Sequence, residues 1–321
     1  MPTRASSPRR RPSGGSGAPD ARIGGRARRA WAGFASAITS AQDAIGVERL
    51  TGTLAKVKAA RAVAIGVRDA SVPFSYVGPA GMPIGYSIDL CRAIVDEIQE
   101  EIGAGDLALR FVPVSPQNRI ARVVEGTVDL ECGSTTRNAE RQKEVAFSPV
   151  FFVSGTKLMV RRGAPFRSYR DFKGRSVAVT EGTTNEAAIA ALDARERLGM
   201  KIVRFRDHDQ SFAALASGKV DAWAGDDALL YAQAAGSPHP REFAILSEYL
   251  SYDPYGIMFR KNDPALAAVV TRTFEKLAAS RELARIYDQW FLRKLPSGVT
   301  LGIRRSPQLE SIFEALGQPT E

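Results

Sequence analysis

The chain has 321 residues, enough for two domains that each bury a hydrophobic core. Its 44% hydrophobic and 25% charged residues are ordinary for a globular protein. The net charge of +9 is concentrated at one end, since residues 1–41 hold eight arginines and one acid, which leaves about +2 for the rest. The folded part is therefore nearly neutral, which argues against a nucleic-acid-binding protein.

The first 41 residues are predicted to be a secretory signal peptide or a disordered basic leader. Residues 1–29 are rich in Arg, Ser, Gly and Pro and show no apolar periodicity. A short apolar run follows at residues 31–38, and residues 39–41 are small, as at a signal cleavage site. The true start and the cleavage site stay open. No run of roughly eighteen apolar residues occurs after residue 41, so the mature chain is not expected to span a membrane.

The body of the chain begins with a predicted strand and a predicted helix. Ala62–Val67 is a short apolar run that ends at Arg68. Ser87 is predicted to cap a helix with apolar residues every three or four positions. These apolar positions are Ile88, Cys91, Val95, Ile98 and Ile102.

A second strand and a second helix are predicted next. Residues 107–114 have the composition of a strand. Ser115 then supplies an N-cap and Pro116 a first helical position, which places Arg119 in the opening turns of a helix.

The stretch from residue 128 to residue 142 is the most informative in the chain. A predicted strand, residues 128–132, is followed by Gly133, which allows close backbone approach, and by hydroxyl donors at residues 134–136. Arg141 is expected about a turn and a half into a following helical segment, from which its guanidinium can return to the same point. Donors that converge beyond a strand's carboxyl end indicate an anion site, and a carboxylate suits a guanidinium.

Further along, strands and helices continue to alternate, which predicts an α/β fold. Ser176–Thr180 is a predicted strand. Thr183 and Glu186 have the spacing of a capping box for a helix that runs to about Leu198.

The sequence also repeats itself. Residues 126–133 (GTVDLECG) resemble residues 218–225 (GKVDAWAG), and each copy follows an amphipathic helical segment. Two such units predict two lobes of related construction rather than a solenoid. Polar residues follow both strands, so a ligand enclosed between the lobes would meet both sets.

The chain contains two cysteines, Cys91 and Cys132. In an exported protein they form a disulfide, and the alternative is two buried free thiols; the sequence leaves both open. Neither cysteine lies near the predicted cleavage site, so a lipid anchor on a new N-terminal cysteine is not expected and export would release a soluble protein.

Polar residues at the predicted strand-to-helix turns form one candidate site. Three arginines and a histidine stand against one carboxylate, and hydroxyls complete the set, which suits a zwitterion with one surplus negative charge, an acidic amino acid. Singly, each residue has a simpler explanation: a surface charge, or a helix cap at residues 183–184, 207–209 or 226–227. The set comprises Arg68, Arg119, Ser134, Thr136, Arg141, Thr184, His208 and Asp226.

Signatures of enzymes and cofactors are weak. The sequence has no P-loop, no dinucleotide-binding glycine motif and no nucleophile elbow. Its two histidines and two cysteines lack the spacing of a zinc site. We therefore expect no catalytic residue, no cofactor and no metal.

These residues and their order resemble the periplasmic solute-binding proteins of ABC transporters, specifically the glutamate/aspartate-binding branch of family 3. The resemblance covers about residues 50–290. The matching stretches are residues 67–76, 85–89, 117–120, 131–136, 140–142, 183–184, 207–208 and 225–230.

By position, the resemblance implies a role for each member of the candidate site. Arg141 would bind the α-carboxylate with Ser134, Thr136 and Thr184, and Asp226 would accept the ammonium group. Arg68, Arg119 and His208 would bind the side-chain carboxylate. One departure is Pro116, where the related pattern tends to carry a serine, which puts one hydroxyl contact in doubt.

The resemblance also implies a two-lobed, hinge-bending fold of type II with the ligand between the lobes. Residues 50–151 and 251–312 would form one lobe and residues 152–250 the other, with crossings near residues 152–156 and 249–255. The expected partners are glutamate or aspartate and the membrane permease subunits of an ABC importer. The protein is expected to be a periplasmic monomer.

Two other functions were considered for the same fold. A dehydratase acting on a prephenate-like dicarboxylate would need an acid in the cleft, such as Glu131 or Glu181. A sensor would need a membrane span and an output domain, and the sequence shows neither.

Overall fold

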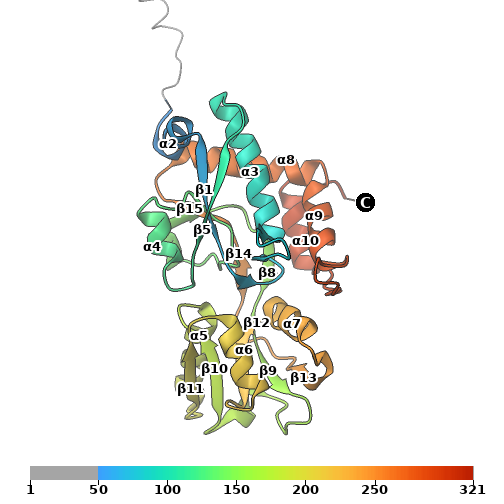
Figure 1. Ribbon diagram of the computed structural model, residues 1–321. Coiled ribbons are helices and arrows are strands. Elements are labelled where there is room, and N and C mark those ends of the chain that lie inside the picture. Colours follow the sequence, from blue (N-terminus) through green and yellow to red (C-terminus); the bar gives the residue numbers. More distant parts are fainter. Residues whose placement is uncertain (1–49, 321) are drawn as a thin grey trace, which may run out of the picture. The chain divides into compact units, whose positions relative to one another are not determined.

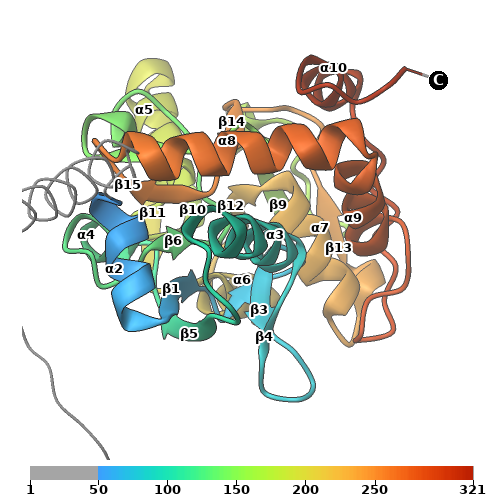
Figure 2. The same ribbon diagram turned by 90° about the horizontal axis from the view of Figure 1, so that it is seen from above.

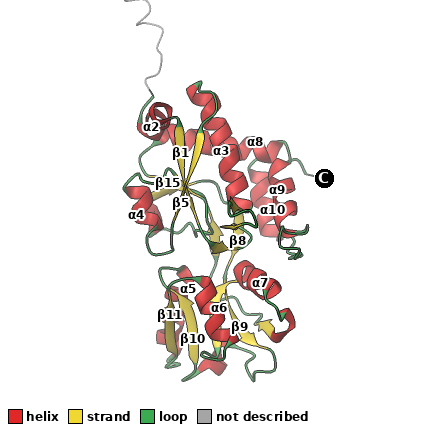
Figure 3. Cartoon of the chain, in the orientation of Figure 1, coloured by secondary structure: helices red, strands yellow, loops and turns green. Residues whose placement is uncertain are grey.

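The computed structural model describes residues 50–320, and the predicted leader at residues 1–41 lies outside them. The described residues form two lobes, each built on a five-stranded sheet with helices beside it (Figures 1 and 3). The predicted α/β class and two-lobed fold are thus confirmed, whereas the predicted residue limits of the lobes stay predictions. Among residues 50–320, no helix combines the length and apolarity that crossing a membrane requires.

The sheet of the first lobe combines residues from both ends of the described chain. Its order is β5 (Ala108–Pro113), β1 (Ala62–Val67), β6 (Leu130–Glu131), β15 (Met258–Arg260) and β7 (Val145–Phe147). Strand β1 is parallel to β5 and β6, whereas β15 is antiparallel to β6 and β7. A small sheet of β2 (Ala70–Ser71), β3 (Ser75–Val77) and β4 (Pro83–Ile84) follows β1.

The helices of this lobe enclose its core. Figure 2 shows the long helix α8 running beside α3. One hydrophobic cluster draws residues from α3, α8, α9 and α10. The helices are α2 (Gly52–Ala60), α3 (Tyr86–Ile102), α4 (Arg119–Val124), α8 (Pro264–Ala279), α9 (Glu282–Phe291) and α10 (Pro307–Ala315), with the 3-10 turn η1 (Arg141–Lys143).

The sheet of the second lobe repeats this plan with one continuous stretch of chain. Its order is β11 (Lys201–Phe205), β10 (Ser176–Thr180), β12 (Ala222–Asp226), β9 (Thr156–Arg161) and β13 (Phe243–Ile245). Strand β10 is parallel to β11 and β12, and β9 is antiparallel to β12 and β13. Its helices are α5 (Thr184–Glu196), α6 (His208–Ala216) and α7 (Asp227–Gly236), with the 3-10 turns η2 (Tyr169–Phe172) and η3 (Pro240–Glu242).

The internal repeat explains why the two sheets share a plan. In each copy a glycine with positive φ, Gly126 (+74°) or Gly218 (+78°), follows the preceding helix. In each copy the aspartate side chain then accepts a hydrogen bond from the first half of the neighbouring strand: Asp129 from Ala64 N and Asp221 from Ser176 N, both at 2.8 Å. The repeated Val-Asp therefore fixes the middle strand of each sheet against its parallel neighbour, as the prediction of two related lobes requires.

The chain crosses between the lobes twice, and the crossing segments pair with each other. Strand β8 (Phe152–Ser154) is antiparallel to β14 (Asp253–Tyr255). Phe152 and Tyr255 are buried and belong to the core of the first lobe. These two paired strands lie within the stretches, residues 152–156 and 249–255, where the crossings are predicted; we call the pair the hinge.

Two helices begin at other residues than predicted, because the predicted capping residues bind other partners in the folded protein. Helix α3 begins at Tyr86 after Gly85, not after Ser87, because the Ser87 hydroxyl donates to Gly133 O at 2.8 Å. Its five predicted apolar residues are buried, as expected. Helix α4 begins at Arg119, not at Pro116, because Asn118 Oδ1 accepts from Ser115 N at 2.8 Å and closes a turn over residues 115–118.

Around the anion-site stretch the regular elements are shorter than predicted. The strand expected at residues 128–132 is β6, Leu130–Glu131. The helical segment expected before Arg141 is absent, since Arg141 itself opens the three-residue turn η1. Its backbone N–H is held by Asn138 Oδ1 at 2.9 Å. The side chain nevertheless returns to the turn, because Arg141 Nη1 donates to Thr136 O at 2.9 Å.

Candidate functional site

Most of the predicted site residues surround one small cavity where the carboxyl ends of the strands of both lobes meet. Arg68 follows β1, residues 134 and 136 follow β6, Thr184 follows β10, His208 follows β11 and Asp226 ends β12. The cavity has a volume of about 10 Å³, room for roughly one water molecule. It is lined by Arg68, Arg119, Ser134, Thr136, Thr183, Thr184, His208 and Asp226.

Two residues differ from the predicted set. Arg141 does not line the cavity but lies next to it, since its guanidinium also reaches Gly182 O at 3.4 Å. Thr183 lines the cavity, although the sequence indicated a helix cap only. It is indeed the N-cap of α5, where its hydroxyl accepts from Glu186 N at 3.2 Å. The reciprocal bond of a capping box is absent, because Glu186 accepts from Gly182 N instead.

A disulfide and several hydrogen bonds fix the turn after β6 on the side away from the cavity. Cys132 is disulfide-bonded to Cys91 of α3, with 6.3 Å between the Cα atoms, which settles the alternative that the sequence left open. Gly133 is required here, because a Cβ atom would lie 2.4 Å from Glu131 Oε1. The Thr135 hydroxyl donates to Glu131 Oε2 and accepts from Arg119 Nη1, both at 2.6 Å. These bonds fix Ser134 and Thr136 toward the cavity side of the turn.

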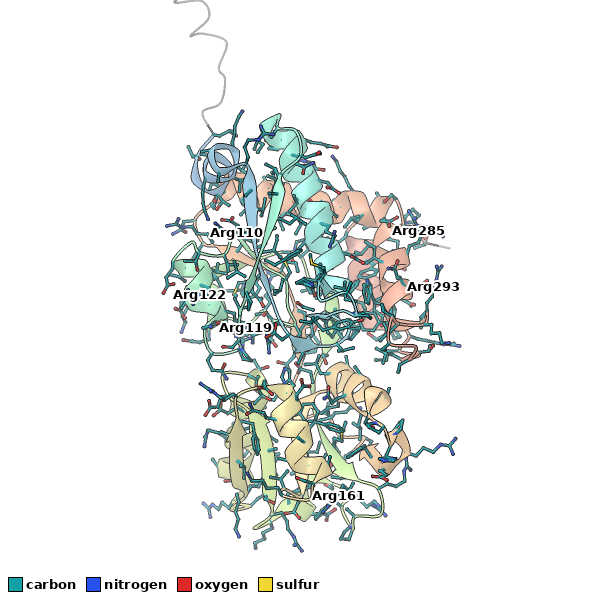
Figure 4. The ribbon with its side chains drawn as sticks, viewed as in Figure 1. Arg110, Arg119, Arg122, Arg161, Arg285 and Arg293 are labelled. Atoms are coloured by element: carbon teal, nitrogen blue, oxygen red, sulfur yellow. A yellow bond between two sulfur atoms is a disulfide. The ribbon has the colours of Figure 1, made fainter. Side chains whose placement is uncertain are left out.

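The three arginines at the site, Arg68, Arg119 and Arg141, are buried. Burial is the main cause that lowers the pKa of Arg68 to about 10 and that of Arg141 to about 9. The nearby charge of Arg119 is the second cause of both shifts. Both values lie above 7, so the guanidinium groups keep their protons. Arg119 Nε has no hydrogen-bond partner among the described residues. Figure 4 shows Arg119 on the part of the first lobe nearest the second. Buried cations with free donors attract an anion.

His208 is a neutral hydrogen-bonding group, not a fourth cation. Burial, reinforced by the charges of Arg68 and Arg119, lowers its pKa to about 3. Its Nδ1 lies 3.0 Å from Thr180 Oγ1. The surplus of positive charge predicted from the sequence therefore comes from the arginines. Asp207, the neighbouring residue, is the N-cap of α6, as its side chain accepts from Gln210 N at 2.8 Å.

Asp226 is a buried carboxyl group that does not serve as a helix cap. It occupies the N-cap position of α7, but its oxygens accept from Asn185 Nδ2 at 2.9 Å and from the Tyr255 hydroxyl at 2.5 Å. Burial, reinforced by the charge of Asp253, raises the pKa of Asp226 to about 7. A cationic group placed beside Asp226 would favour its ionised form. Asp227, the first residue of α7, accepts from the N–H of the next residue, Ala228, at 2.7 Å.

The lobes touch each other around the cavity. Gln117 Nε2 of the first lobe donates to Glu181 O and Arg206 O of the second, both at 3.0 Å. Thr136 Oγ1 and Thr184 Oγ1, from opposite lobes, lie 3.2 Å apart. A Cβ atom at Gly182 would lie 3.0 Å from Pro116 O. These contacts describe a closed arrangement, so a ligand of amino-acid size enters only when the lobes separate.

Neither acid required by the dehydratase hypothesis lines this cavity. Glu131 is fully buried behind the turn and bonded to Thr135. Glu181 lines a separate cavity of about 610 Å³, which also includes Arg68 and Gln117. Among residues 50–320, no group of His, Cys, Asp and Glu side chains has the arrangement of a metal site.

Comparisons with known proteins agree on one family. Residues 63–293 match the bacterial extracellular solute-binding proteins, family 3. The chain is 41% identical over 276 residues to the L-glutamate/L-aspartate-binding protein of Pseudomonas aeruginosa, covering 85% of this chain and 90% of the relative. It is 36% identical over 284 residues to the glutamate/aspartate import solute-binding protein of Salmonella typhimurium, covering 88% and 93%.

Solved structures of amino-acid-binding proteins share the fold. A mutant of ArgBP from T. maritima superimposes with a TM-score of 0.68 at 28% identity, covering 75% of this chain and 100% of that one. An ancestral amino acid-binding protein, described as a precursor of cyclohexadienyl dehydratase, gives a TM-score of 0.62 at 26% identity, covering 75% and 99%.

Proposed function

Because the chain belongs to the bacterial extracellular solute-binding proteins of family 3, we propose that it binds L-glutamate, L-aspartate or both by closing its lobes around the ligand. The bound amino acid would then be delivered to the membrane permease subunits of an ABC importer. Relatives at 36–41% identity carry names of binding proteins, so no catalytic step is part of this function.

One observation carries the choice of ligand. Three buried guanidinium groups, from Arg68, Arg119 and Arg141, lie around a cavity whose wall includes a buried carboxyl group, that of Asp226. An acidic amino acid has two carboxylates and one ammonium group, which matches this charge pattern. A neutral amino acid would leave part of the buried positive charge without a partner, which is costly.

The proposed contacts follow the positions of the side chains. Arg141 binds the α-carboxylate with hydroxyl or backbone donors of Ser134, Thr136 and Thr184, and Asp226 accepts from the ammonium group. Arg68, Arg119 and neutral His208 bind the side-chain carboxylate. Pro116 faces the second lobe through its carbonyl group and offers no hydroxyl, so the contact that the related pattern makes with a serine is not part of the proposal.

The place of action follows from the family. We propose that the chain is exported through its N-terminal segment, residues 1–41, and acts as a monomer in the periplasm. The disulfide between Cys91 and Cys132 supports an oxidising compartment, because such bonds are rare in the cytosol.

Thermal unfolding with a panel of amino acids tests the ligand. Glutamate or aspartate at about 100 times its dissociation constant stabilises the native state by roughly 2.7 kcal/mol. We expect a clear rise in melting temperature with one or both, and none with glutamine or asparagine. A rise with neutral amino acids alone would contradict the proposal.

Two arginines of α4 provide a matched pair of variants. Arg119 is buried at the cavity, whereas Arg122, one turn later on the same helix, is exposed (Figure 4). Arg119→Met is expected to abolish the glutamate-dependent rise, because a charge-assisted contact to the second carboxylate is lost. Arg122→Met is expected to leave it unchanged. Equal responses of the two variants would remove Arg119 from the site.

A further inference from the structure

A buried chain of hydrogen bonds joins the cavity to the hinge. The Thr136 hydroxyl, in the cavity wall, donates to Asp253 Oδ1 of β14 at 3.1 Å. Asp253 Oδ2 accepts from the Ser251 hydroxyl. Because a hydroxyl has one hydrogen and that of Thr136 is donated to Asp253, Thr184 is the donor in the contact between the two threonines.

The chain of bonds continues into the other crossing segment and returns to the cavity. Ser251 Oγ accepts from Thr156 N at 2.9 Å. Thr156 Oγ1 accepts from Asn185 Nδ2 at 2.8 Å, and the same amide nitrogen donates to Asp226 Oδ1 at 2.9 Å. The two cavity residues Thr136 and Asp226, one from each lobe, are thus connected through residues of both crossing segments, Ser251 and Asp253 on one side and Thr156 on the other.

Asp253 is an unusual residue for such a place. Its exposed fraction is 2%, and among residues 50–320 no Lys, Arg or His nitrogen lies within 4.0 Å of its carboxylate. Arg141 interacts with Asp253 electrostatically, without a direct ion pair. A buried carboxylate that lacks a direct ion pair is costly, which points to a role for Asp253. Its partners are the hydroxyls of a cavity residue and of a hinge residue.

We propose that Asp253 is a positioning residue that couples ligand binding to hinge closure, holding Thr136 through one carboxylate oxygen and Ser251 through the other. The proposal rests on the proposed function, because it concerns capture of the same ligand. Thr136 belongs to the first lobe and contacts Thr184 of the second only when the lobes are together. Asp253 therefore orients the Thr136 hydroxyl from the hinge at the moment when the lobes meet.

Asp253 also acts on Asp226 through its charge. The groups that face Asp226 are Asp253 and Tyr255 of β14, Asp227 of α7, Asn185 of α5 and the guanidinium of Arg141. After burial, the charge of Asp253 is the strongest influence that raises the pKa of Asp226, and the hydrogen bonds from Tyr255 and Asn185 oppose it. Without that charge the pKa of Asp226 falls, and the ionised form that accepts an ammonium group persists to lower pH.

Three variants separate these roles, with glutamate and aspartate binding measured by calorimetry from about pH 5 to about pH 8. Asp253→Asn keeps an acceptor for Thr136 and removes the charge, so the fall in affinity on the acid side should move by about one pH unit to lower pH. Asp253→Ala removes both, and affinity at neutral pH should fall roughly 10-fold. Ser251→Ala breaks the hinge branch alone, so it should weaken binding without moving the acid limb.

The outcomes distinguish this inference from the proposed function. Wild-type protein that binds neither glutamate nor aspartate would refute the proposed function, and the role of Asp253 in capture with it. Normal wild-type binding, together with unchanged affinity in Asp253→Ala and an unmoved acid limb in Asp253→Asn, would refute the role of Asp253 alone. Circular dichroism of each variant verifies that it is folded, and the isosteric Asp253→Asn keeps the test valid should the alanine variant not fold.

Discussion

The carboxyl group of Asp226 has to be ionised to accept an ammonium group, yet its surroundings favour the protonated form. Burial, reinforced by Asp253, raises its pKa to about 7. His208, with a pKa of about 3, does not titrate in the same range. Glutamate affinity should therefore be highest above about pH 7 and fall on acidification, by up to about tenfold per pH unit well below the pKa. Calorimetry across this range measures the effect, and an affinity that is flat between about pH 5 and pH 8 would contradict it.

The raised pKa of Asp226 also predicts that its ionisation, which ligand binding needs, lowers the stability of the ligand-free fold. Because the folded-state pKa of Asp226 lies above the ordinary value of 3.8, protonation stabilises the ligand-free fold at low pH, and this contribution is lost as the pH rises through about 7. Asp226→Asn should therefore increase the free energy of unfolding at about pH 8, by at most about 4 kcal/mol, while abolishing binding. Urea unfolding of the two ligand-free proteins measures the difference. Asp227→Asn, at the next position, serves as the comparison: Asp227 is half-buried and accepts from the Ser154 and Tyr249 hydroxyls. If the free energy of unfolding of Asp226→Asn were lower than that of the wild type, the charge of Asp226 would not be destabilising the ligand-free fold.

At the scale of single residues, the sequence indicated those candidate site residues that are polar or charged and directly follow a predicted strand. Arg68, Ser134 and Asp226 are examples, and they do gather at one cavity. Asp253 gave no such signal, because it lies in a hinge strand and reaches Thr136 only in the folded protein, 117 positions away along the chain. The neutrality of His208 was equally hidden, since it follows from burial beside arginines.

Among the elements, helix α3 and the turn after strand β6 are joined by the disulfide between Cys91 and Cys132, which closes a loop with a sequence separation of 41 residues. A loop of that length restricts the unfolded chain, so removing the bond should lower the free energy of unfolding by roughly 2–4 kcal/mol. The double variant Cys91→Ala/Cys132→Ala tests this by urea unfolding with and without reductant.

Ligand affinity should change little in that variant. The turn after β6 keeps its bonds from Ser87 to Gly133 O and from Arg119 to Thr135. The wild type under reductant should approach the stability of the double variant, and the variant itself should not respond to reductant. A large loss of affinity without loss of stability would mean that the disulfide shapes the site directly.

The predicted helices and strands are confirmed where a local sequence pattern determines the element. They are wrong at their ends where contacts with distant residues determine where the element begins. The apolar runs of β1 and β10 and the helical periodicity of α3 are properties of a few consecutive residues, and the structure confirms them. Serine is a common N-cap residue, but the Ser87 hydroxyl donates its hydrogen bond to the carbonyl of Gly133, 46 residues away. No local pattern could reveal that partner.

At the scale of the whole molecule, closure depends on how near the lobes can approach. Gly182 has φ +74°, and an added Cβ would lie 3.0 Å from Pro116 O of the other lobe. Gly174, in the same lobe, has φ +69° and nothing within 4 Å of an added Cβ. Alanine at either position should destabilise the fold by about 1–2 kcal/mol through backbone strain. Only Gly182→Ala should also weaken glutamate binding, by roughly 10-fold or more, because closure is obstructed.

Calorimetry and urea unfolding of the two glycine variants separate strain from closure. The comparison Gly182→Ala against Gly174→Ala cancels the backbone term, which is similar at the two positions. Equal affinities would show that the contact between Gly182 and Pro116 is not needed for closure around the ligand.

The order of strands along the chain has a consequence for synthesis. All five strands of the second sheet lie between Thr156 and Ile245, so that sheet has all of its strands once this stretch has been made. The first sheet does not, because β15, Met258–Arg260, is the strand that separates β6 from β7. The first sheet therefore lacks its fourth strand, between β6 and β7, while the whole of the second lobe is made. A nascent chain that stops before Met258 contains one finished sheet and one that cannot close.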